Sequence, residues 1–190
     1  MNRIITNSQI VLAFLLSTFS FCADVKAATY YLKTDKFDAS PTDWSPWSTS
    51  NGTAILGVND SNARSANNDF VMALNGGTSS DFVLIDKVFS VWTFAQGGPP
   101  PGVTPSMCTV WAYVRPLHNV TGALQLINAN TWTYIGSQSF SLSTSTSYTL
   151  VRLDVVGPQC AADMDVRIGL SGNGGSQLIW VDDVTITWVY

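Results

Sequence analysis

Glutamate is absent from the sequence, histidine occurs once, and charged side chains of all kinds are scarce. Charged residues make up 12% of the 190 residues, about half of the usual share of roughly a quarter. The formal net charge is −4, so the surface is weakly acidic. Nucleic acids and anionic membranes bind basic surfaces, and we therefore expect neither as a partner.

The same scarcity limits the catalytic sites that the chain can build. The one histidine, His118, lies in Pro-Leu-His-Asn-Val-Thr-Gly, which is typical of a turn, and no Gly-x-Ser-x-Gly nucleophile motif occurs. Glycoside hydrolases use paired carboxylates, which here would both be aspartates, and most aspartates lie in turn-like segments. Gly-Asn-Gly-Gly-Ser precedes a strand pattern rather than a helix, unlike a phosphate-binding loop. The sequence predicts a protein that is not an enzyme, and a small hydrolase is the least favoured alternative.

Long apolar runs are also missing, apart from one near the N-terminus. Residues 10–21 are apolar except for Ser and Thr, they follow a segment with Arg3 and no acid, and Val25-Lys26-Ala27 precedes the rest of the chain. This pattern predicts a secretory signal peptide over residues 1–27. A lipoprotein cleavage before Cys22 is the alternative, which the bulky Phe21 disfavours. We expect one secreted domain over residues 28–190, extracellular or periplasmic, with no membrane span.

Three cysteines occur, and Cys22 lies within the predicted signal peptide. The other two, Cys108 and Cys160, are predicted to form a disulfide, because a secreted chain meets an oxidising environment. A zinc site is the weaker alternative, since zinc would need further thiolates or histidines.

What the sequence does contain is a series of strand patterns. No segment after residue 28 has a sustained helical spacing of apolar residues, whereas β-branched and aromatic runs recur between Gly, Asn, Ser and Pro clusters. A Pro-rich segment over residues 97–106 predicts a loop, either a spacer or the rim of a site. The pattern favours an all-β, two-sheet antiparallel sandwich with jelly-roll topology. The expected strands cover residues 29–33, 54–58, 70–75, 82–94, 109–115, 123–128, 133–142, 147–156, 165–170 and 177–189.

Four stretches resemble a known family. They are Lys-Phe-Asp-Ala-Ser-Pro-Thr-Asp-Trp (residues 36–44), Asn-Ala-Arg-Ser-Ala-Asn-Asn-Asp-Phe-Val-Met-Ala-Leu (62–74), Cys-Thr-Val-Trp-Ala-Tyr-Val-Arg-Pro (108–116) and Leu-Ile-Trp-Val-Asp-Asp-Val-Thr-Ile (178–186). Together they resemble the secreted jelly-roll carbohydrate-binding modules of the galactose-binding-domain-like superfamily, which are attached to cellulases and xylanases. The sequence departs from the family at Asp38, where Glu is frequent, and at Tyr148, where Trp is frequent.

The paired aspartates of the last stretch lie in an apolar strand. Alternation groups Asp182 with Val184 and Ile186, so we expect Asp182 to point into the core and Asp183 to point out. The resemblance implies a structural Ca²⁺ ion between the first and last strands, held by Asp38 and Asp182 with an oxygen from residues 67–69. The alternative is that Asp182 accepts backbone N–H bonds and binds no metal.

A binding face is predicted from alternation in three strands. Val110, Ala112 and Val114 form a core stripe, which leaves Trp111, Tyr113 and Arg115 on the outside. By the same reasoning Arg152 and Gln125 point outward from their strands, and all five would form one surface if the three strands share a sheet. Sugar rings stack on aromatic side chains and hydrogen-bond to Arg and Gln. The alternative is that the Pro-rich loop covers Trp111 and Tyr113 as a second small core. Further candidates are the loop tryptophans Trp44, Trp47 and Trp132.

The function predicted from these features is noncatalytic, lectin-like binding of a poly- or oligosaccharide by a secreted module. The alternative is a structural or adhesive cell-surface subunit with the same fold and no glycan ligand. A groove lined by aromatic and polar side chains would favour the first, and a flat apolar patch would favour the second.

Overall fold

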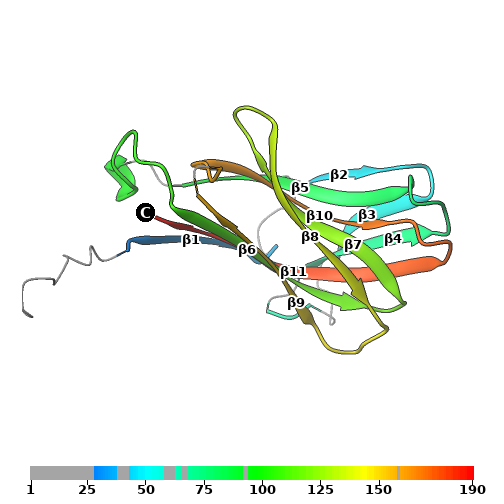
Figure 1. Cartoon of the computed structure of the whole chain (residues 1–190). Helices are drawn as coiled ribbons and strands as arrows, with labels where there is room; N and C mark the ends of the chain where they lie inside the picture. Colours follow the sequence, from blue (N-terminus) through cyan, green and yellow to red (C-terminus); the bar gives the residue numbers. More distant parts are fainter. Residues whose placement is uncertain (1–27, 38–42, 58–62, 66–67, 92–93, 158) are drawn as a thin grey trace, which may run out of the picture.

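The fold is a sandwich of two antiparallel sheets packed face to face (Figure 1). The computed structural model describes residues 28–37, 43–57, 63–65, 68–91, 94–157 and 159–190. The predicted signal peptide, residues 1–27, and the predicted calcium ligand Asp38 lie outside the described residues. Within the described ranges there is no helix with the length and apolar character of a membrane span. The predicted all-β sandwich is confirmed.

Sheet A has six strands and sheet B has five. Sheet A runs β3-β4-β11-β6-β9, with β1 also paired to β11, and sheet B runs β2-β5-β10-β7-β8. The strands of sheet A are β1 (Tyr30–Asp35), β3 (Gly52–Gly57), β4 (Asp69–Asn75), β6 (Met107–Pro116), β9 (Thr149–Val156) and β11 (Ser176–Val189). The strands of sheet B are β2 (Ser45–Ser48), β5 (Phe82–Ser90), β7 (Val120–Asn128), β8 (Thr133–Leu142) and β10 (Asp163–Ser171).

The core lies between the sheets and is built from alternate residues of each strand. The predicted core stripe of β6, Val110, Ala112 and Val114, is fully buried. The β9 stripe that alternation predicts is also buried, with Arg152 and Asp154 exposed between its members. Period-two patterning therefore predicted the buried side of both strands correctly.

The strand predicted over residues 82–94 ends at Ser90, and Phe94–Gln96 form a short 3-10 helix. Two further segments also differ from the prediction. Strand β2 was not predicted, because its sequence Ser-Pro-Trp-Ser lacks apolar alternation; it lies at the edge of sheet B, where proline is tolerated. Trp44, predicted as a loop candidate for binding, is buried instead and packs against Phe37, Phe70 and Phe89, with ring centroids 5.4, 6.4 and 6.0 Å away. It belongs to the core and is removed from the candidate binding residues.

The predicted disulfide between Cys108 and Cys160 is present, with the two Cα atoms 5.8 Å apart. It joins the start of β6 to the segment before β10, and both residues are buried. A bond that closes a loop of this size stabilises a domain by about 2–4 kcal/mol.

Strand β11 is interrupted by a β-bulge at the paired aspartates. Asp182 lies opposite Tyr113 of β6 and Thr185 lies opposite Trp111, so two residues of β11 face one residue of β6. Asp183 has a positive φ of 48°. The extra residue shifts the alternation, which places Asp182 on the outer side of the sheet with Tyr113, not in the core with Val184. The prediction that Asp182 points into the core is wrong for this reason.

Candidate functional site

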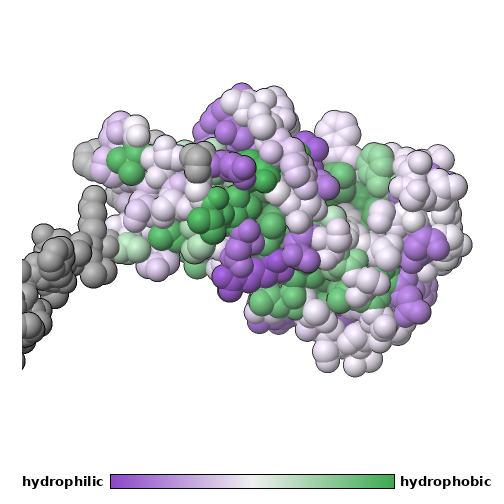
Figure 2. Space-filling model, viewed as in Figure 1, coloured by the Kyte–Doolittle hydropathy of each residue, from purple (hydrophilic) through white to green (hydrophobic). Residues whose placement is uncertain are grey.

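The sandwich offers two outer surfaces, which we call face A (outside of sheet A) and face B (outside of sheet B). Of the predicted ligand residues, Trp111, Tyr113, Arg115 and Arg152 lie together on face A. Gln125 lies on face B, because β7 belongs to the other sheet. The expectation that Gln125 neighbours Arg152 is therefore wrong. On the side of the molecule seen in Figure 2, apolar and hydrophilic patches lie side by side, so individual contacts decide what each face can bind.

On face A the aromatic rings are already covered by arginine side chains. The guanidinium carbon of Arg64 lies 3.5 Å from the ring centroid of Tyr113. That of Arg115 lies 4.3 Å from the ring centroid of Trp180 and 5.4 Å from that of Tyr148. These are cation–π distances. The predicted alternative was that the Pro-rich loop covers Trp111 and Tyr113 as a second small core; the contact observed on Tyr113 is instead with Arg64.

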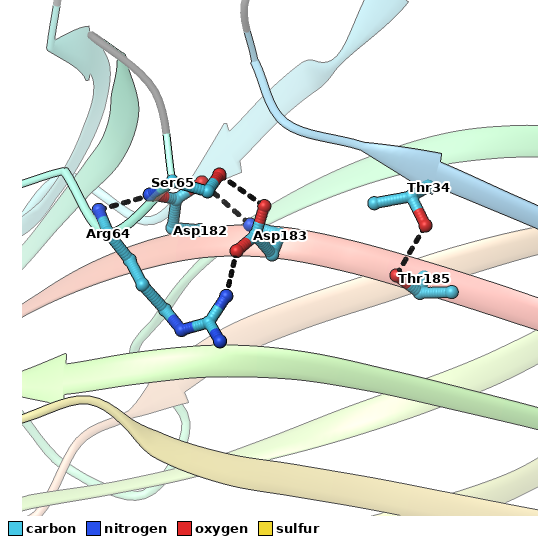
Figure 3. Close-up of polar contacts among 6 residues, drawn as sticks. All are labelled: Thr34, Arg64, Ser65, Asp182, Asp183 and Thr185. Carbon is cyan, nitrogen blue, oxygen red and sulfur yellow. Dashed lines mark hydrogen bonds and ion pairs between the residues drawn. The ribbon is translucent and has the colours of Figure 1, made fainter.

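The segment that carries Arg64 is fixed to face A by the two aspartates of the bulge (Figure 3). The Asp182 carboxylate accepts the backbone N–H groups of Arg64 at 2.6 Å, Ser65 at 3.2 Å and Asp183 at 2.7 Å. The Asp183 carboxylate accepts the Arg64 guanidinium and the Ser65 hydroxyl. Burial raises the pKa of Asp182, and the three N–H donors offset this only in part. Asp182 thus has the backbone-acceptor role that was the alternative to a metal.

The described residues contain no group of three or more His, Cys, Asp or Glu side chains placed to hold an ion. Both oxygens of Asp182 face N–H donors, which do not coordinate cations. Asp38, the other predicted calcium ligand, lies outside the described residues.

Face B is arranged in rows that cross all five strands. The pairing registers align Trp47 and Leu84 with Gly169, Ala123 and Ser139 in one row. The next row contains Ser45, Asp86, Arg167, Gln125 and Ser137. One row therefore has small residues at its centre, and its neighbour has polar ones.

The small residues form the floor of a shallow hollow. Gly169 and Ala123 lie at its base, and Phe82, Arg167 and Gln125 line it. A Cβ atom on Gly169 would lie 2.5 Å from the Cβ of Leu84, so only glycine fits this close approach of β10 and β5. The hollow has apolar and hydrogen-bonding groups within reach of one ligand.

A second hollow on face B has two exposed tryptophans. Trp47 is 58% exposed and Trp132 is 64% exposed, and both line this hollow with Asp86 and Val88. The Trp47 indole Nε1 donates to Asp86 Oδ1 at 2.8 Å, which fixes the ring on the strand. The sequence around both residues predicts loops, whereas Trp47 lies within β2 of sheet B and Trp132 lies in the turn between β7 and β8.

The turn that presents Trp132 is also held in place. Asn128 Oδ1 accepts the N–H groups of Asn130 at 2.9 Å and Thr131 at 3.2 Å, and the Asn128 carbonyl accepts the Trp132 N–H at 2.8 Å. Trp132 itself has a positive φ of 55°. Side-chain bonds of this kind stabilise turns. Hydrogen bonds therefore support both tryptophans of the second hollow, within its own turn for Trp132 and across to β5 for Trp47.

A buried ion pair lies on face B along β10. Asp165, which is fully buried, accepts a hydrogen bond from Arg167 Nε on its Oδ2 at 2.8 Å, and Arg167 Nη2 lies 2.8 Å from the same oxygen. Burial raises the pKa of Asp165; the Arg167 charge lowers it in part, and the nearby Asp86 raises it further. Arg167 also lines the first hollow, so the pair places one covered and one partly exposed charge on the outer side of β10.

Known structures share this architecture. No protein-family model and no curated protein matches the sequence. A family 11 carbohydrate-binding module from Clostridium thermocellum, in complex with a β-1,3-1,4-mixed-linked tetrasaccharide, matches with a TM-score of 0.53 and 10% identity over 84% of this chain and 96% of the module. A CBM4 structure matches with a TM-score of 0.52 and 15% identity over 80% of this chain and 98% of that one.

Two further matches differ in how much of the other protein they cover. A CBM61 structure in complex with β-1,4-galactotriose has a TM-score of 0.51 and 12% identity over 82% of this chain and 93% of the module. The chain spans only 20% of the enzymatically active domain of a bacteriophage CBA120 tailspike protein, with a TM-score of 0.51, 11% identity and 78% of this chain covered. These identities establish a shared fold. The predicted resemblance to jelly-roll carbohydrate-binding modules is confirmed at that level.

Proposed function

We propose that this protein is a secreted, noncatalytic module that binds a poly- or oligosaccharide on face B. The observation that carries the proposal is the pair of exposed tryptophans, Trp47 and Trp132, over one hollow beside Asp86. The apolar C–H face of a sugar ring stacks on an exposed indole, and its hydroxyl groups pair with nearby polar side chains. The buried disulfide suits an oxidising, extracellular compartment.

The same observation favours glycan binding over the structural-subunit alternative. The exposed aromatics of face B border hollows that also contain Arg167, Gln125 and Asp86, instead of a continuous apolar patch. Surfaces that pack against other proteins have an apolar centre from which charged residues are depleted. Structures of this fold that contain oligosaccharides, among them the family 11 and CBM61 complexes, support the proposal by analogy.

Face A is the second candidate surface, with the residues that the sequence predicts: Trp111, Tyr113, Arg115 and Arg152. Gln125 belongs to face B under either proposal. Face A is the second candidate because the Arg64 guanidinium lies over the Tyr113 ring and Trp111 is only partly exposed.

Affinity electrophoresis against soluble glycans distinguishes the two surfaces. The panel contains mixed-linked β-glucan, galactan, xylan and mannan. Burying a large apolar side chain contributes about 1.5–3 kcal/mol, so Trp47→Ala and Trp132→Ala should each weaken binding roughly 10- to 100-fold. Trp111→Ala is the matched control on face A and should retain wild-type mobility. Loss of binding only in Trp111→Ala would move the site to face A, and no retardation of the wild type by any glycan would overturn the proposed function.

We further propose a structural calcium ion with the carboxylates that the sequence predicts, Asp38 and Asp182. An ion at Asp182 would have to replace its N–H bonds to Arg64 and Ser65. A ligand that binds only the folded state raises the melting temperature by mass action. A melting temperature that is higher in calcium than in chelator, and a response that Asp182→Ala abolishes, would support the ion. Identical melting of the wild type in both conditions would overturn it.

A further inference from the structure

We propose that the Asp165–Arg167 pair makes face B selective for uncharged sugars over acidic ones. This inference rests on the proposed function, because Arg167 lines the first hollow of face B and its cross-strand neighbour Asp86 lines the second, which holds the two tryptophans. We call these two hollows together the groove. In it Arg167 donates hydrogen bonds to sugar oxygens, and Asp165 is a positioning residue that fixes the guanidinium and cancels its charge. The ligand class is a neutral glycan, and glycans with carboxylate or sulfate groups are rejected.

The position of the pair is the first argument. Arg167 lies at the centre of its row, between Asp86 of β5 and Gln125 of β7. It also lines the hollow whose floor is Gly169 and Ala123. Its side chain is 29% exposed, whereas the side chain of Asp165 is fully buried. Of the two charges, the groove therefore presents only the arginine to a ligand.

The hydrogen bonds of Arg167 are the second argument. A guanidinium group has five N–H donors, and the contacts of Arg167 with described residues use its Nε and Nη2 atoms on a single oxygen of Asp165. Its remaining donors are available to the groove. Asp165 Oδ1 is buried and has no hydrogen-bond partner among the described residues. Water or a ligand commonly supplies the missing hydrogen bond of such an atom.

The local charge is the third argument. Asp165 neutralises Arg167, and Asp86, beside it in the row, adds a further negative charge next to Trp47. Lys87 does not compensate for Asp86, because its ammonium group binds Asp35 at 2.5 Å and Asp43 at 3.2 Å. A sugar carboxylate on Arg167 would thus meet a groove that is neutral or negative. Unfavourable charges of this kind set specificity by excluding the wrong ligand.

Face A contains a matched control pair. Arg152 and Asp154 are also two residues apart on the outside of a strand, and Arg152 donates Nε and Nη2 to Asp154 at 2.9–3.0 Å. This pair is open to solvent, with side chains 55% and 44% exposed. The two pairs share their chemistry and spacing and differ in burial and face.

The test compares each glycan that the wild-type protein retains with its carboxymethylated derivative, using β-glucan, galactan, xylan and mannan. A hydroxyethyl derivative of equal substitution controls for steric bulk. The wild type should bind the hydroxyethyl form at least about tenfold more tightly than the carboxymethyl form, because repulsion of the added carboxylates by Asp86 and Asp165 costs at least about that factor. Asp165→Asn should reduce this preference about tenfold or more, since it leaves the Arg167 charge uncancelled. Arg167→Gln should weaken neutral binding about tenfold and leave the acidic derivative rejected.

Melting curves must show that the face B variants are folded. Arg167→Lys is a milder second variant, because it retains the charge without the two-nitrogen contact. It should weaken binding of the neutral glycan less than Arg167→Gln does. Arg152→Gln and Asp154→Asn should leave the preference unchanged. If the folded Asp165 and Arg167 variants retain the wild-type preference and affinity while Trp47→Ala loses binding, the inference is overturned and the proposed function stands. If the wild type binds the carboxymethyl form as tightly as the hydroxyethyl form, the inference is also overturned. If the wild type retains no glycan at all, both fail.

Discussion

Face A and face B both place arginine beside aromatic or polar side chains on the outside of an antiparallel sheet. On face A the guanidinium groups of Arg64 and Arg115 lie over the rings of Tyr113 and Trp180, so the protein itself occupies those ring faces. On face B the arginine is paired with a buried carboxylate, and the tryptophans Trp47 and Trp132 stay open to solvent. The number of aromatic residues on a surface is therefore a poor guide to ligand binding. The number of aromatic ring faces that are open to solvent is a better guide.

The comparison also separates stability from recognition. The Asp182–Asp183 bulge on face A fixes a segment that is more than 100 residues away in the sequence, through bonds separated by 117 to 119 positions. On face B, the bond between Trp47 and Asp86 is a long-range polar contact of this kind that holds an exposed tryptophan. We expect changes on face A to alter folding and changes on face B to alter binding.

The largest expected effect is on stability and comes from face A. Asp182→Ala would leave the buried N–H of Asp183 and the partly buried N–H groups of Arg64 and Ser65 without their acceptor. An unsatisfied buried donor costs about 1–3 kcal/mol, and partly buried donors cost less because water can reach them. The free energy of unfolding should fall by about 2–4 kcal/mol, measured by urea denaturation in chelator so that any bound calcium does not contribute. Trp47→Ala on face B should change it by less than about 0.5 kcal/mol, as exposed substitutions do. A folded Asp182→Ala protein with reduced glycan affinity would mean that face A takes part in binding.

The second expected effect is on binding and comes from filling the groove. Ala123→Phe should block the hollow on face B and weaken glycan binding roughly tenfold or more, because the ring would occupy the ligand's volume. Ala73→Phe is the matched change on face A, since Ala73 also points outward from an inner strand of its sheet. It should leave binding unchanged in titration calorimetry with the retained glycan. Equal losses in the two variants would contradict the assignment of binding to face B.

The buried and outward sides of single strands could be predicted from the sequence. The Val-Ala-Val stripe of β6 has only one register that buries it, so Trp111, Tyr113 and Arg115 had to point outward. Alternation of apolar and polar residues does not reveal to which sheet a strand belongs. Strand β7 follows β6 directly in the chain but pairs with β8 and β10, so Gln125 points outward from the opposite side of the molecule.

Other features depend on contacts that have no local signal. Nothing in Val-Asp-Asp-Val indicates that two residues of β11 will face one residue of β6, and this bulge reverses the predicted side of Asp182. The cover of Tyr113 comes from Arg64, which is distant in the sequence. Trp44 and Trp47 lie three positions apart in one polar segment, yet the first is in the core and the second is exposed, because Phe37, Phe70 and Phe89 meet only in the folded chain.

The smallest expected effect is a difference in sign between the pH dependences of the two Arg–Asp pairs. The hydrogen bonds from Arg152 and Thr109 hold the pKa of Asp154 below its ordinary value of 3.8, so Asp154 contributes stability above that pH that is lost as the pH falls through its lowered pKa. Burial raises the pKa of Asp165 above 3.8, so its contribution is present below that pH and is lost as the pH rises through its raised pKa. Urea denaturation between about pH 2 and pH 7 should therefore show the wild-type advantage over Asp154→Asn growing with pH and the advantage over Asp165→Asn shrinking. The change for Asp154 should be the smaller one, because water screens an exposed pair. If the stability advantage of the wild type over Asp154→Asn and its advantage over Asp165→Asn changed in the same direction with pH, the two pairs would not differ in burial as described.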